Sequence, residues 1–211
     1  LQEMGFEQLS GRISGQRAAS GWSLATEQLA FVSEQGLVWS GGNVRLQFSE
    51  AAGQQPAKGQ LQGESLDLQT LRDLALRWPL SERWHDSLAS HTLTGLVRSL
   101  QLQWDGSLES AQNLQGQIRA EQLHIEALPG TSASGHGLQG VQLDAQWSPQ
   151  GGQAQIHIDQ DGWLAWPGLL EDDRIDVRQL QADARWQWHG QQITSAQWKA
   201  QLSNDDLQGQ V

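Results

Sequence analysis

Two histidine–carboxylate pairs have the residue types and spacing that could do chemistry in this chain. His157 lies two residues before Asp159, and His124 lies two residues before Glu126. An imidazole beside a carboxylate can hold a metal ion or move a proton. Each pair offers only two ligands, however, and residues two apart in a β-strand share one face, here the polar one. We therefore interpret both pairs as parts of a solvated surface, and we expect no metal site and no cofactor.

Other catalytic signatures find little support in the sequence. The acidic run EDDRID at 171–176 could attract calcium, but it lacks the ligand spacing and the glycine of a dedicated calcium loop. We interpret it as an acidic turn. No serine lies in a nucleophile elbow, and no glycine-rich loop leads into a helix to cradle a phosphate. We expect that the chain is not an enzyme and has no catalytic residues.

The composition excludes several partners and structures. The 211 residues carry a formal net charge of −11, which argues against nucleic acid as a partner because its backbone is also negative. There is no cysteine, which excludes disulfides and thiolate metal sites. No run of about 18 apolar residues is present that could cross a membrane as a helix. The chain contains 11 tryptophans but no tyrosine, so the tryptophans are the clue that remains.

The elements that must position these side chains are mostly strands. Apolar and polar residues alternate in a succession of short segments, separated by turn signals such as SGG, DG, PQGG and QDG. Alternation between tight turns predicts antiparallel strands with one apolar and one polar face. The alternating segments are 44–48, 100–104, 114–118, 123–125, 141–147, 154–158, 180–188 and 196–202.

One segment, at about 68–90, departs from the two-residue period. Leu68, Leu71, Leu74, Ala75 and Trp78 form one stripe at helical spacing, and Leu80, Trp84 and Leu88 form a second. Pro79 should separate them, because the residue before a proline avoids the helical conformation. Asp67 and Ser81 are suitable N-caps. The sequence thus predicts a short helix–Pro–helix insertion in a long sheet. A second irregular stretch, LPGTSASGHG at 128–137, predicts an exposed loop.

A weak repeat of Leu-x-Gly accompanies the strands, with glycines at 11, 63, 116, 140 and 209. Glycine within a strand often marks a bend, a bulge or a close approach, so the repeat suggests a sheet that curls in the same direction again and again. The alternative is that glycine is simply common here. The chain starts at Leu1 and stops within a strand pattern, DLQGQV, so we expect it to be a piece of a longer protein.

The tryptophans belong to the apolar face of these strands. Trp104, Trp147, Trp186, Trp188 and Trp198 are in phase with leucine, isoleucine, valine and alanine, whereas a carbohydrate-binding platform is often built in loops. The simplest structure for such a face is the closed core of a β-sandwich, because most one-faced sheets bury that face on another sheet. The alternation alone leaves open whether the face is sealed or exposed.

The order of elements resembles a known family. The stretch from LDLQTLRDLALRWPLSERW to SLQLQW gives a leucine-rich helix, a proline, a second helix and a strand ending in an aromatic residue. It is followed by NLQGQIRAEQLHI, a Pro-Gly loop, GLQGVQL and the tryptophan-rich strands up to QLSNDDLQGQV. In this order the chain is similar to the AsmA-like group of bacterial envelope proteins, and within it to the YhdP type. The resemblance covers about residues 60–211 well and the start less clearly.

The resemblance implies a mostly β fold: a long, curved antiparallel sheet forming an open apolar groove, of which residues 1–211 would be one section. It implies a periplasmic bridge, anchored to the inner membrane by a segment outside this chain and reaching toward the outer membrane. Phospholipid acyl chains would pass along the groove and support outer-membrane integrity. The residues expected to form the groove are Leu100, Leu102, Trp104, Leu114, Ile118, Leu123, Ile125, Val141, Leu143, Trp147, Ile156, Ile158, Leu180, Ala182, Ala184, Trp186, Trp188, Trp198 and Leu202.

Two alternatives remain at this point. One is a β-sandwich binding module with a closed core, for a glycan or a protein ligand. The other is a fragment of an outer-membrane barrel, which the helical insertion and the absence of tyrosine from any aromatic girdle disfavour. Whether the apolar face is open or capped by a second sheet distinguishes the groove from the sandwich.

Overall fold

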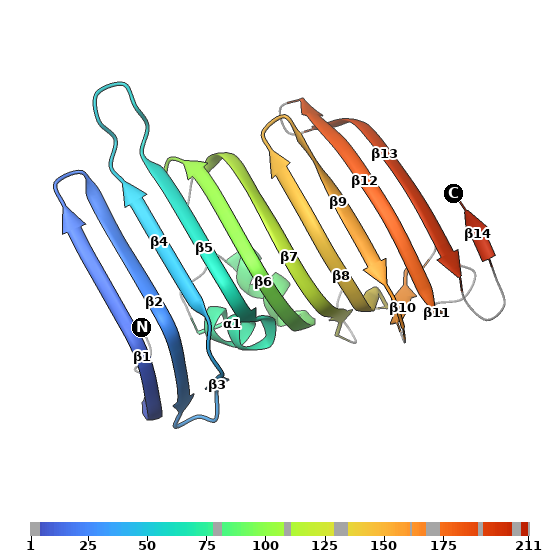
Figure 1. Ribbon diagram of the computed structural model, residues 1–211, viewed down its shortest axis with the longest axis horizontal. Helices are drawn as coiled ribbons and strands as arrows, with labels where there is room; N and C mark the ends of the chain where they lie inside the picture. Colours follow the sequence, from blue (N-terminus) through green and yellow to red (C-terminus); the bar gives the residue numbers. More distant parts are fainter. Residues whose placement is uncertain are drawn as a thin grey trace.

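The strands form one open antiparallel sheet in a computed structural model that describes residues 5–77, 82–107, 111–128, 135–160, 162–167, 174–189, 192–203 and 208–210. Fourteen strands in these ranges belong to the sheet, and its main path follows the order β1-β2-β4-β5-β6-β7-β8-β9-β12-β13-β14. Neighbouring strands along this path therefore mostly follow one another in the chain (Figure 1). The mostly β fold with a short helical insertion that the sequence predicted is confirmed.

Each alternating segment lies in a strand, and the long strands β1 and β2 are additional to those segments. Two predicted segments, at 114–118 and 123–125, belong to a single strand, β7, that a bulge interrupts. The strands are β1 Phe6–Ala18, β2 Gly21–Ser33, β3 Val38–Trp39, β4 Asn43–Ser49, β5 Lys58–Asp67, β6 His91–Asp105, β7 Gln112–Ala127, β8 Gly137–Ser148, β9 Gly151–Ile158, β10 Gly162–Ala165, β11 Ile175–Val177, β12 Gln179–His189, β13 Gln192–Ser203 and β14 Gln208–Gln210.

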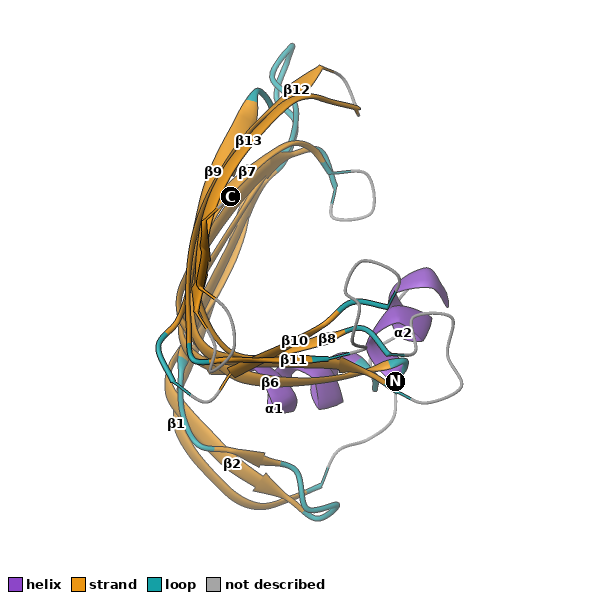
Figure 2. Ribbon diagram, turned by 90° about the vertical axis from the view of Figure 1, so that its right-hand side faces the viewer, coloured by secondary structure: helices purple, strands orange, loops and turns teal. Residues whose placement is uncertain are grey.

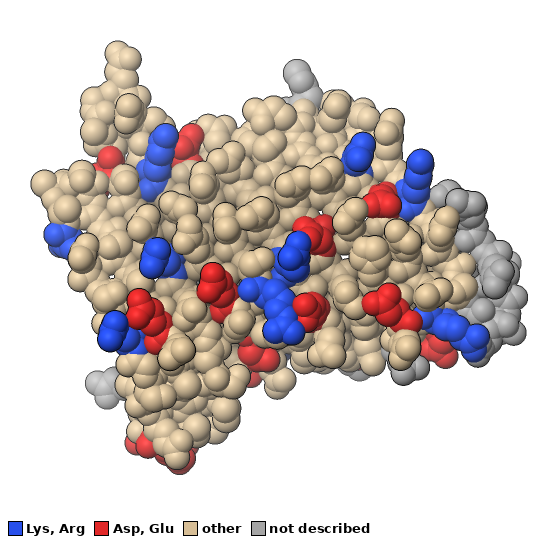
Figure 3. Space-filling model, viewed as in Figure 1, with Lys and Arg blue, Asp and Glu red and all other residues tan. Residues whose placement is uncertain are grey.

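The two faces of the sheet differ in polarity and in curvature. Basic and acidic side chains are scattered over the face turned to the viewer in Figure 3. The sheet also carries ion pairs between Arg119 and Asp144 and between Arg98 and Glu121. Figure 2 shows that this face is convex, because the strands curl away from it at both ends. We call it the outer face. The apolar residues alternate with these and point to the concave side, which we call the inner face.

The lower part of the inner face is a true core. Val97, Ala120, Val141, Ile158 and Val177 retain at most 4% of their accessible surface. They belong to one cluster that also includes Phe31, Leu37, Trp39, Leu66 and Leu123. We call this cluster the corner core, because it lies where the strands turn from the wall of the sheet into its curled lower end (Figure 2).

Aligned bulges cause this turn. The register slips beside Gly95 in β6, beside Gln122 in β7 and beside Gly140 in β8. Gly95 has φ +131°, and a Cβ there would lie 3.0 Å from the backbone oxygen of Gln122. A bulge bends a strand and increases its twist, so three in neighbouring strands bend the sheet along one line. Of the Leu-x-Gly sites, only Gly11 and Gly140 have a positive φ.

The helices are α1 Leu68–Ala75 and α2 Glu82–Ala89. The predicted N-cap of α1 is confirmed, since Asp67 Oδ1 accepts the Thr70 backbone N–H at 2.7 Å. Several predicted features lie outside the described residues. They are Pro79, Leu80, Ser81 and the side chain of Trp84 in the helical insertion, residues 129–134 of the predicted loop, and residues 171–173 of the acidic run. The remainder of that run forms part of β11 and contains an ion pair between Arg174 and Asp176 at 3.5 Å.

The helix pair packs on the middle of the sheet and not on its edge. α1 contacts β5 and β6, and α2 contacts β6. Leu71 and Leu74 of α1 pack against the corner core, and Thr70 Oγ1 donates a hydrogen bond to the Val38 carbonyl at 2.8 Å. The helix pair therefore packs at the lower end of the sheet, beside the corner core. In the portion of the chain that the structure describes, no helix has the length and apolar character needed to cross a membrane.

Candidate functional site

The predicted groove residues lie on the inner face and are aligned in rows across the strands. One row joins Leu100, Ile118, Ala184 and Trp198 through Ala145 and Ala154. A second, one step nearer the upper rim, contains Leu102, Trp147 and Trp186. By the upper rim we mean the strand ends shared by the pairs β1–β2, β4–β5, β6–β7, β8–β9 and β12–β13 (Figure 1). Ala120, Leu143, Ile156 and Ala182 form a lower row, and Ile158, Leu180 and Leu202 lie below it.

Most of the predicted groove residues are partly or fully exposed to solvent, and four are buried. Leu123, Val141 and Ile158 are buried in the corner core, whereas Trp104 is buried near the upper rim, where its indole lies over Gly59 of β5. Leu114 and Trp198 are exposed, at 45% and 70%. The others are partly exposed: Leu100, Leu102, Ile118, Ile125, Leu143, Trp147, Ile156, Leu180, Ala182, Ala184, Trp186, Trp188 and Leu202. Because the described strands all belong to one sheet, no second sheet covers this face. The closed β-sandwich is therefore wrong for the part of the chain that the structure describes.

Tryptophans on the inner face lie over glycines of the adjacent strand. Gly116 pairs with Trp147, and Gly152 pairs with both Trp147 and Trp186. A Cβ at Gly152 would lie 2.4 Å from Cζ2 of Trp186, and one at Gly116 would lie 2.9 Å from Cζ2 of Trp147. Only glycine leaves room for an indole to lie so close to the backbone. The result is a smooth apolar surface in which the Nε1–H of Trp186 is buried without a partner.

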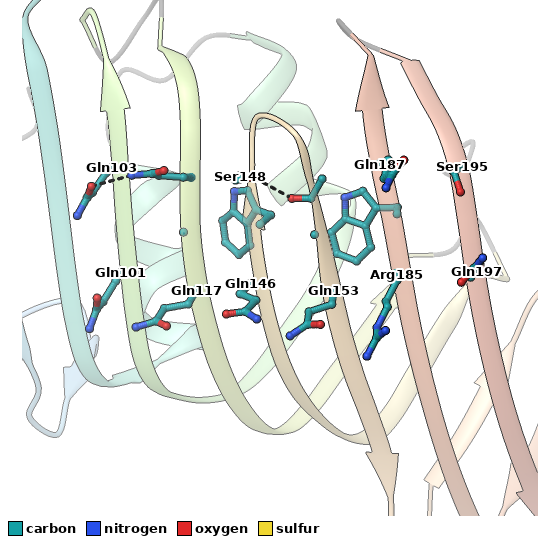
Figure 4. A pocket seen from close by; sticks show the side chains of 16 residues that line it. Gln101, Gln103, Gln117, Gln146, Ser148, Gln153, Arg185, Gln187, Ser195 and Gln197 are labelled. Carbon is teal, nitrogen blue, oxygen red and sulfur yellow. Dashed lines mark hydrogen bonds between the residues drawn. The ribbon is translucent and has the colours of Figure 1, made fainter.

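The outer face carries rows of glutamines. Gln101, Gln117, Gln146 and Gln153 extend from four neighbouring strands, as Figure 4 shows. With a second row nearer the upper rim, they border a shallow hollow of about 740 Å³ whose floor includes the backbone of Gly116 and Gly152. Amides without a net charge keep this face hydrated while adding little to the charge of the molecule.

Ion pairs on the outer face are few and exposed. Arg98 Nε donates to Glu121 Oε2 at 2.8 Å, and this hydrogen bond lowers the pKa of the Glu121 carboxyl. Both side chains are well exposed, at 50% and 38%, so the pair contributes little to stability.

His124 and Glu126 lie together in β7, and His157 lies in β9, whereas Asp159 follows the end of that strand. His124 Nε2 is 3.3 Å from Glu126 Oε2, and Asp159 accepts a hydrogen bond from Gln142 at 2.8 Å. The ring of His124 meets Trp163 edge-on at 5.7 Å. Within the ranges that the structure describes, no group of three or more histidine, aspartate or glutamate side chains could hold a metal ion.

Residues near the start of the chain extend the apolar rows, although the sequence analysis did not include them in the groove. Leu24, Leu46 and Leu61 continue the row of Leu102 onto β2, β4 and β5. Trp22 and Phe48 are paired in the next row and stack at 6.0 Å. The alternation in VRLQF and GQLQG was the available signal.

A comparison with protein families identifies the chain. The family model described as "YhdP protein" matches residues 2–211. The chain belongs to the YhdP protein family. No curated protein and no solved structure gives a significant match. The resemblance that carried the sequence analysis is thereby confirmed, and the match extends to the first strands, which the resemblance covered less clearly.

Membership of the YhdP family places the chain among bridge-like lipid-transport proteins associated with the bacterial envelope. The family is a lipid-transport family and is not known as enzymatic. The open apolar inner face of this YhdP-family chain is accordingly the candidate site.

Proposed function

We propose that this chain conducts phospholipids along its inner face, as one section of a longer periplasmic groove between the inner and outer membranes. The observation that carries the proposal is the large apolar face, which no second sheet covers in the part of the chain that the structure describes. A protein that kept such a face in water without a use for it would risk association. In this proposal an anchor in the inner membrane and the contact with the outer membrane belong to other parts of the protein.

The energetics favour acyl chains as the ligand. Transfer of an acyl chain from hydrocarbon to water raises its free energy by about 0.8 kcal/mol per methylene. A lipid whose chains are exposed to water in the periplasm is therefore very unfavourable. Rows of Leu100, Ile118, Leu143 and Ile156 offer surroundings close to hydrocarbon. Movement from bilayer to groove is then nearly neutral, and a nearly neutral site allows sliding.

The dimensions of the inner face also fit a lipid. From Trp188 at the upper rim to Leu180 the strand rises by about 26 Å, at about 3.3 Å per residue. One leaflet of a bilayer has a hydrocarbon thickness of about 15 Å. The wall is deep enough to cover an acyl chain while the headgroup remains in water at the rim. Eleven strands on the main path, about 4.8 Å apart, give a face about 48 Å long.

Photo-crosslinking from adjacent residues tests the proposal directly. A photoreactive amino acid at Ala184 faces inward, and one at Arg185 faces outward, in the same strand and one residue apart. We expect adducts of phospholipid mass from the Ala184 position in protein purified gently from cells, and none from the Arg185 position. Equal yields at the two positions, or no lipid adduct at Ala184 in folded protein, would refute conduction along this face.

A further inference from the structure

The end of β12 next to the upper rim carries an aromatic corner. The rings of Trp186 and Trp188 are 6.4 Å apart and nearly perpendicular, at 78°. Trp198 lies on the adjacent strand, β13, on the same face and is 70% exposed. We call these three residues the tryptophan corner. Two perpendicular indoles resemble two walls of the aromatic cages that bind ammonium groups. Trp198 pairs with Ala184, one row further from the upper rim than Trp186, and adds an exposed indole to the same face.

The tryptophan corner is held in place from below. A Cβ at Gly152 would lie 2.4 Å from Trp186 Cζ2 and 2.8 Å from its Cε2, so the indole rests on the backbone of β9. The fixed position of Trp186 sets the perpendicular wall that Trp188 completes. A ligand therefore meets a preformed surface, which reduces the entropy lost on binding.

Among the described residues of β12 and β13, the inner face around the tryptophan corner carries no charge. On β12 and β13 the described inward residues are alanine, leucine and tryptophan, while the neighbouring Arg185 and Lys199 point to the outer face. An anion would find no cationic partner here. A cation would find the negative faces of the indoles without a competing positive charge.

From this arrangement we propose that the tryptophan corner binds the ammonium group of a zwitterionic phospholipid headgroup, such as ethanolamine, while the acyl chains lie along the rows below. The inference rests on the proposed lipid conduction and specifies which lipid is favoured. Its position suits this role, because Trp188 lies at the rim, where a headgroup reaches water. A cation–π contact at an exposed site contributes about 0.5–1 kcal/mol, which corresponds to a preference of about two- to fivefold over a lipid without an ammonium group.

Native mass spectrometry with two competing lipids tests the inference. The folded chain is offered an equimolar mixture of phosphatidylethanolamine and phosphatidylglycerol with identical acyl chains. We expect the bound ratio to favour phosphatidylethanolamine by about two- to fivefold. Trp188→Leu and Trp198→Leu keep apolar bulk but remove an indole, and each should bring the ratio of the two bound lipids toward one.

Trp147→Leu is the matched control. Trp147 also lies over a glycine on the inner face, but the described rings include none that pairs with it, so its loss should leave the ratio unchanged. Equal binding of the two lipids by the unaltered chain, or an unchanged ratio in Trp188→Leu and Trp198→Leu, would overturn the headgroup inference alone. Absence of both lipids from folded protein would overturn lipid conduction, and the headgroup inference with it.

Discussion

Alanines of the inner face show how the same residue type meets two environments in one sheet. Ala120 belongs to the corner core and is 1% exposed, whereas Ala184 is partly exposed. Both point to the inner side, so alternation alone does not distinguish them. The difference comes from what lies over each residue.

We expect Ala184→Asp to block lipid passage with only a small loss of stability. Water can reach a carboxylate at this position, so its cost should stay below about 1 kcal/mol, whereas Ala120→Asp buries a charge without a partner and should cost several kcal/mol. Thermal unfolding and a lipid-transfer or outer-membrane integrity assay measure the two effects. Arg185→Asp, on the outer face, should change neither the thermal stability nor the lipid transfer. A collapse of the fold in Ala184→Asp would mean that this part of the face is sealed.

The titration of Glu121 provides a second test at the scale of a residue. Its hydrogen bond to Arg98 lowers the pKa of the carboxyl. The pKa of Glu121 is lower in the folded chain than in the unfolded chain. The pair therefore stabilises the fold at pH values above the pKa of the unfolded chain, and this stabilisation is lost as the pH falls through the pKa of the folded chain. NMR titration should find the pKa of Glu121 below its ordinary value, and Arg98→Ala should raise it. A pKa unchanged by Arg98→Ala would contradict the pairing.

At the scale of elements, the bend of the sheet includes a backbone position in β6 that favours glycine. Gly95 has φ +131°, and a Cβ there would lie 3.0 Å from the backbone oxygens of Gln122 and Glu121. Gly15 in β1 has ordinary backbone geometry, and a Cβ there would make its nearest contact at 3.8 Å. The two glycines look alike in the sequence and differ only in the structure.

Gly95→Ala should therefore destabilise the sheet by about 1–3 kcal/mol through strain and contact with the β7 backbone. Gly15→Ala should change stability by less than about 0.5 kcal/mol, because it adds a methyl group in open space. Urea denaturation of the two variants would show the difference. Similar costs for both would mean that Gly95 is not required for the bend.

Helix α1 allows a separate test of the insertion. Asp67 Oδ1 accepts the Thr70 N–H at 2.7 Å and the Thr70 hydroxyl at 2.8 Å. Asp67→Ala removes this cap and should cost about 1 kcal/mol, whereas Asp67→Asn should retain most of the stability because an amide oxygen can also cap. The comparison is made by thermal unfolding. Equal losses in the two variants would assign the effect to the charge of Asp67 and not to its cap.

The sequence predicted the elements better than their curvature. The alternation located β4, β8, β9, β12 and β13, and the spacing of leucines located α1 and α2. The bend was harder to predict, because the Leu-x-Gly repeat includes Gly63 and Gly116, which have no positive φ, while Gly95 was not recognised as part of it. A bulge depends on the register of two strands, which one strand's pattern does not contain.

At the scale of the molecule, the edge of the sheet formed by β1 is long and exposed. Every residue of β1 is exposed along its 13 positions, including Leu9 at 56% and Ile13 at 59%. An exposed edge strand with apolar residues and without proline is a template for further pairing. This edge agrees with our proposal that the chain is one section of a longer sheet.

We expect the 211-residue chain alone to associate as its concentration rises. Ile13→Lys places a charge on the edge strand and should reduce this association. Gln117→Lys adds the same charge in the middle of the outer face and should leave the association unchanged. Analytical ultracentrifugation measures both. A chain that stays monomeric at high concentration would contradict pairing through β1.

The assignment of convex and concave faces also belongs to this scale. Alternation divided the residues correctly into two faces but gave no indication of which way the sheet curls. The tryptophans therefore fitted a closed sandwich as well as an open groove until the single sheet was known. The register of Gly116 with Trp147 and of Gly152 with Trp186 could not be found in a single segment, because each pair joins different strands.

The direction of the hydrogen bonds in this sheet has a mechanical consequence. The strands run across the long axis of the molecule (Figure 1), so the bonds between strands run along it. A pull on the two ends would stretch the bonds along their length and separate neighbouring strands, instead of shearing them past one another. The β13–β14 pair, with three residue pairs in register, should yield before β12–β13, with eleven. A bridge built in this way bears little tension, and it would function best between membranes whose spacing is maintained by something else.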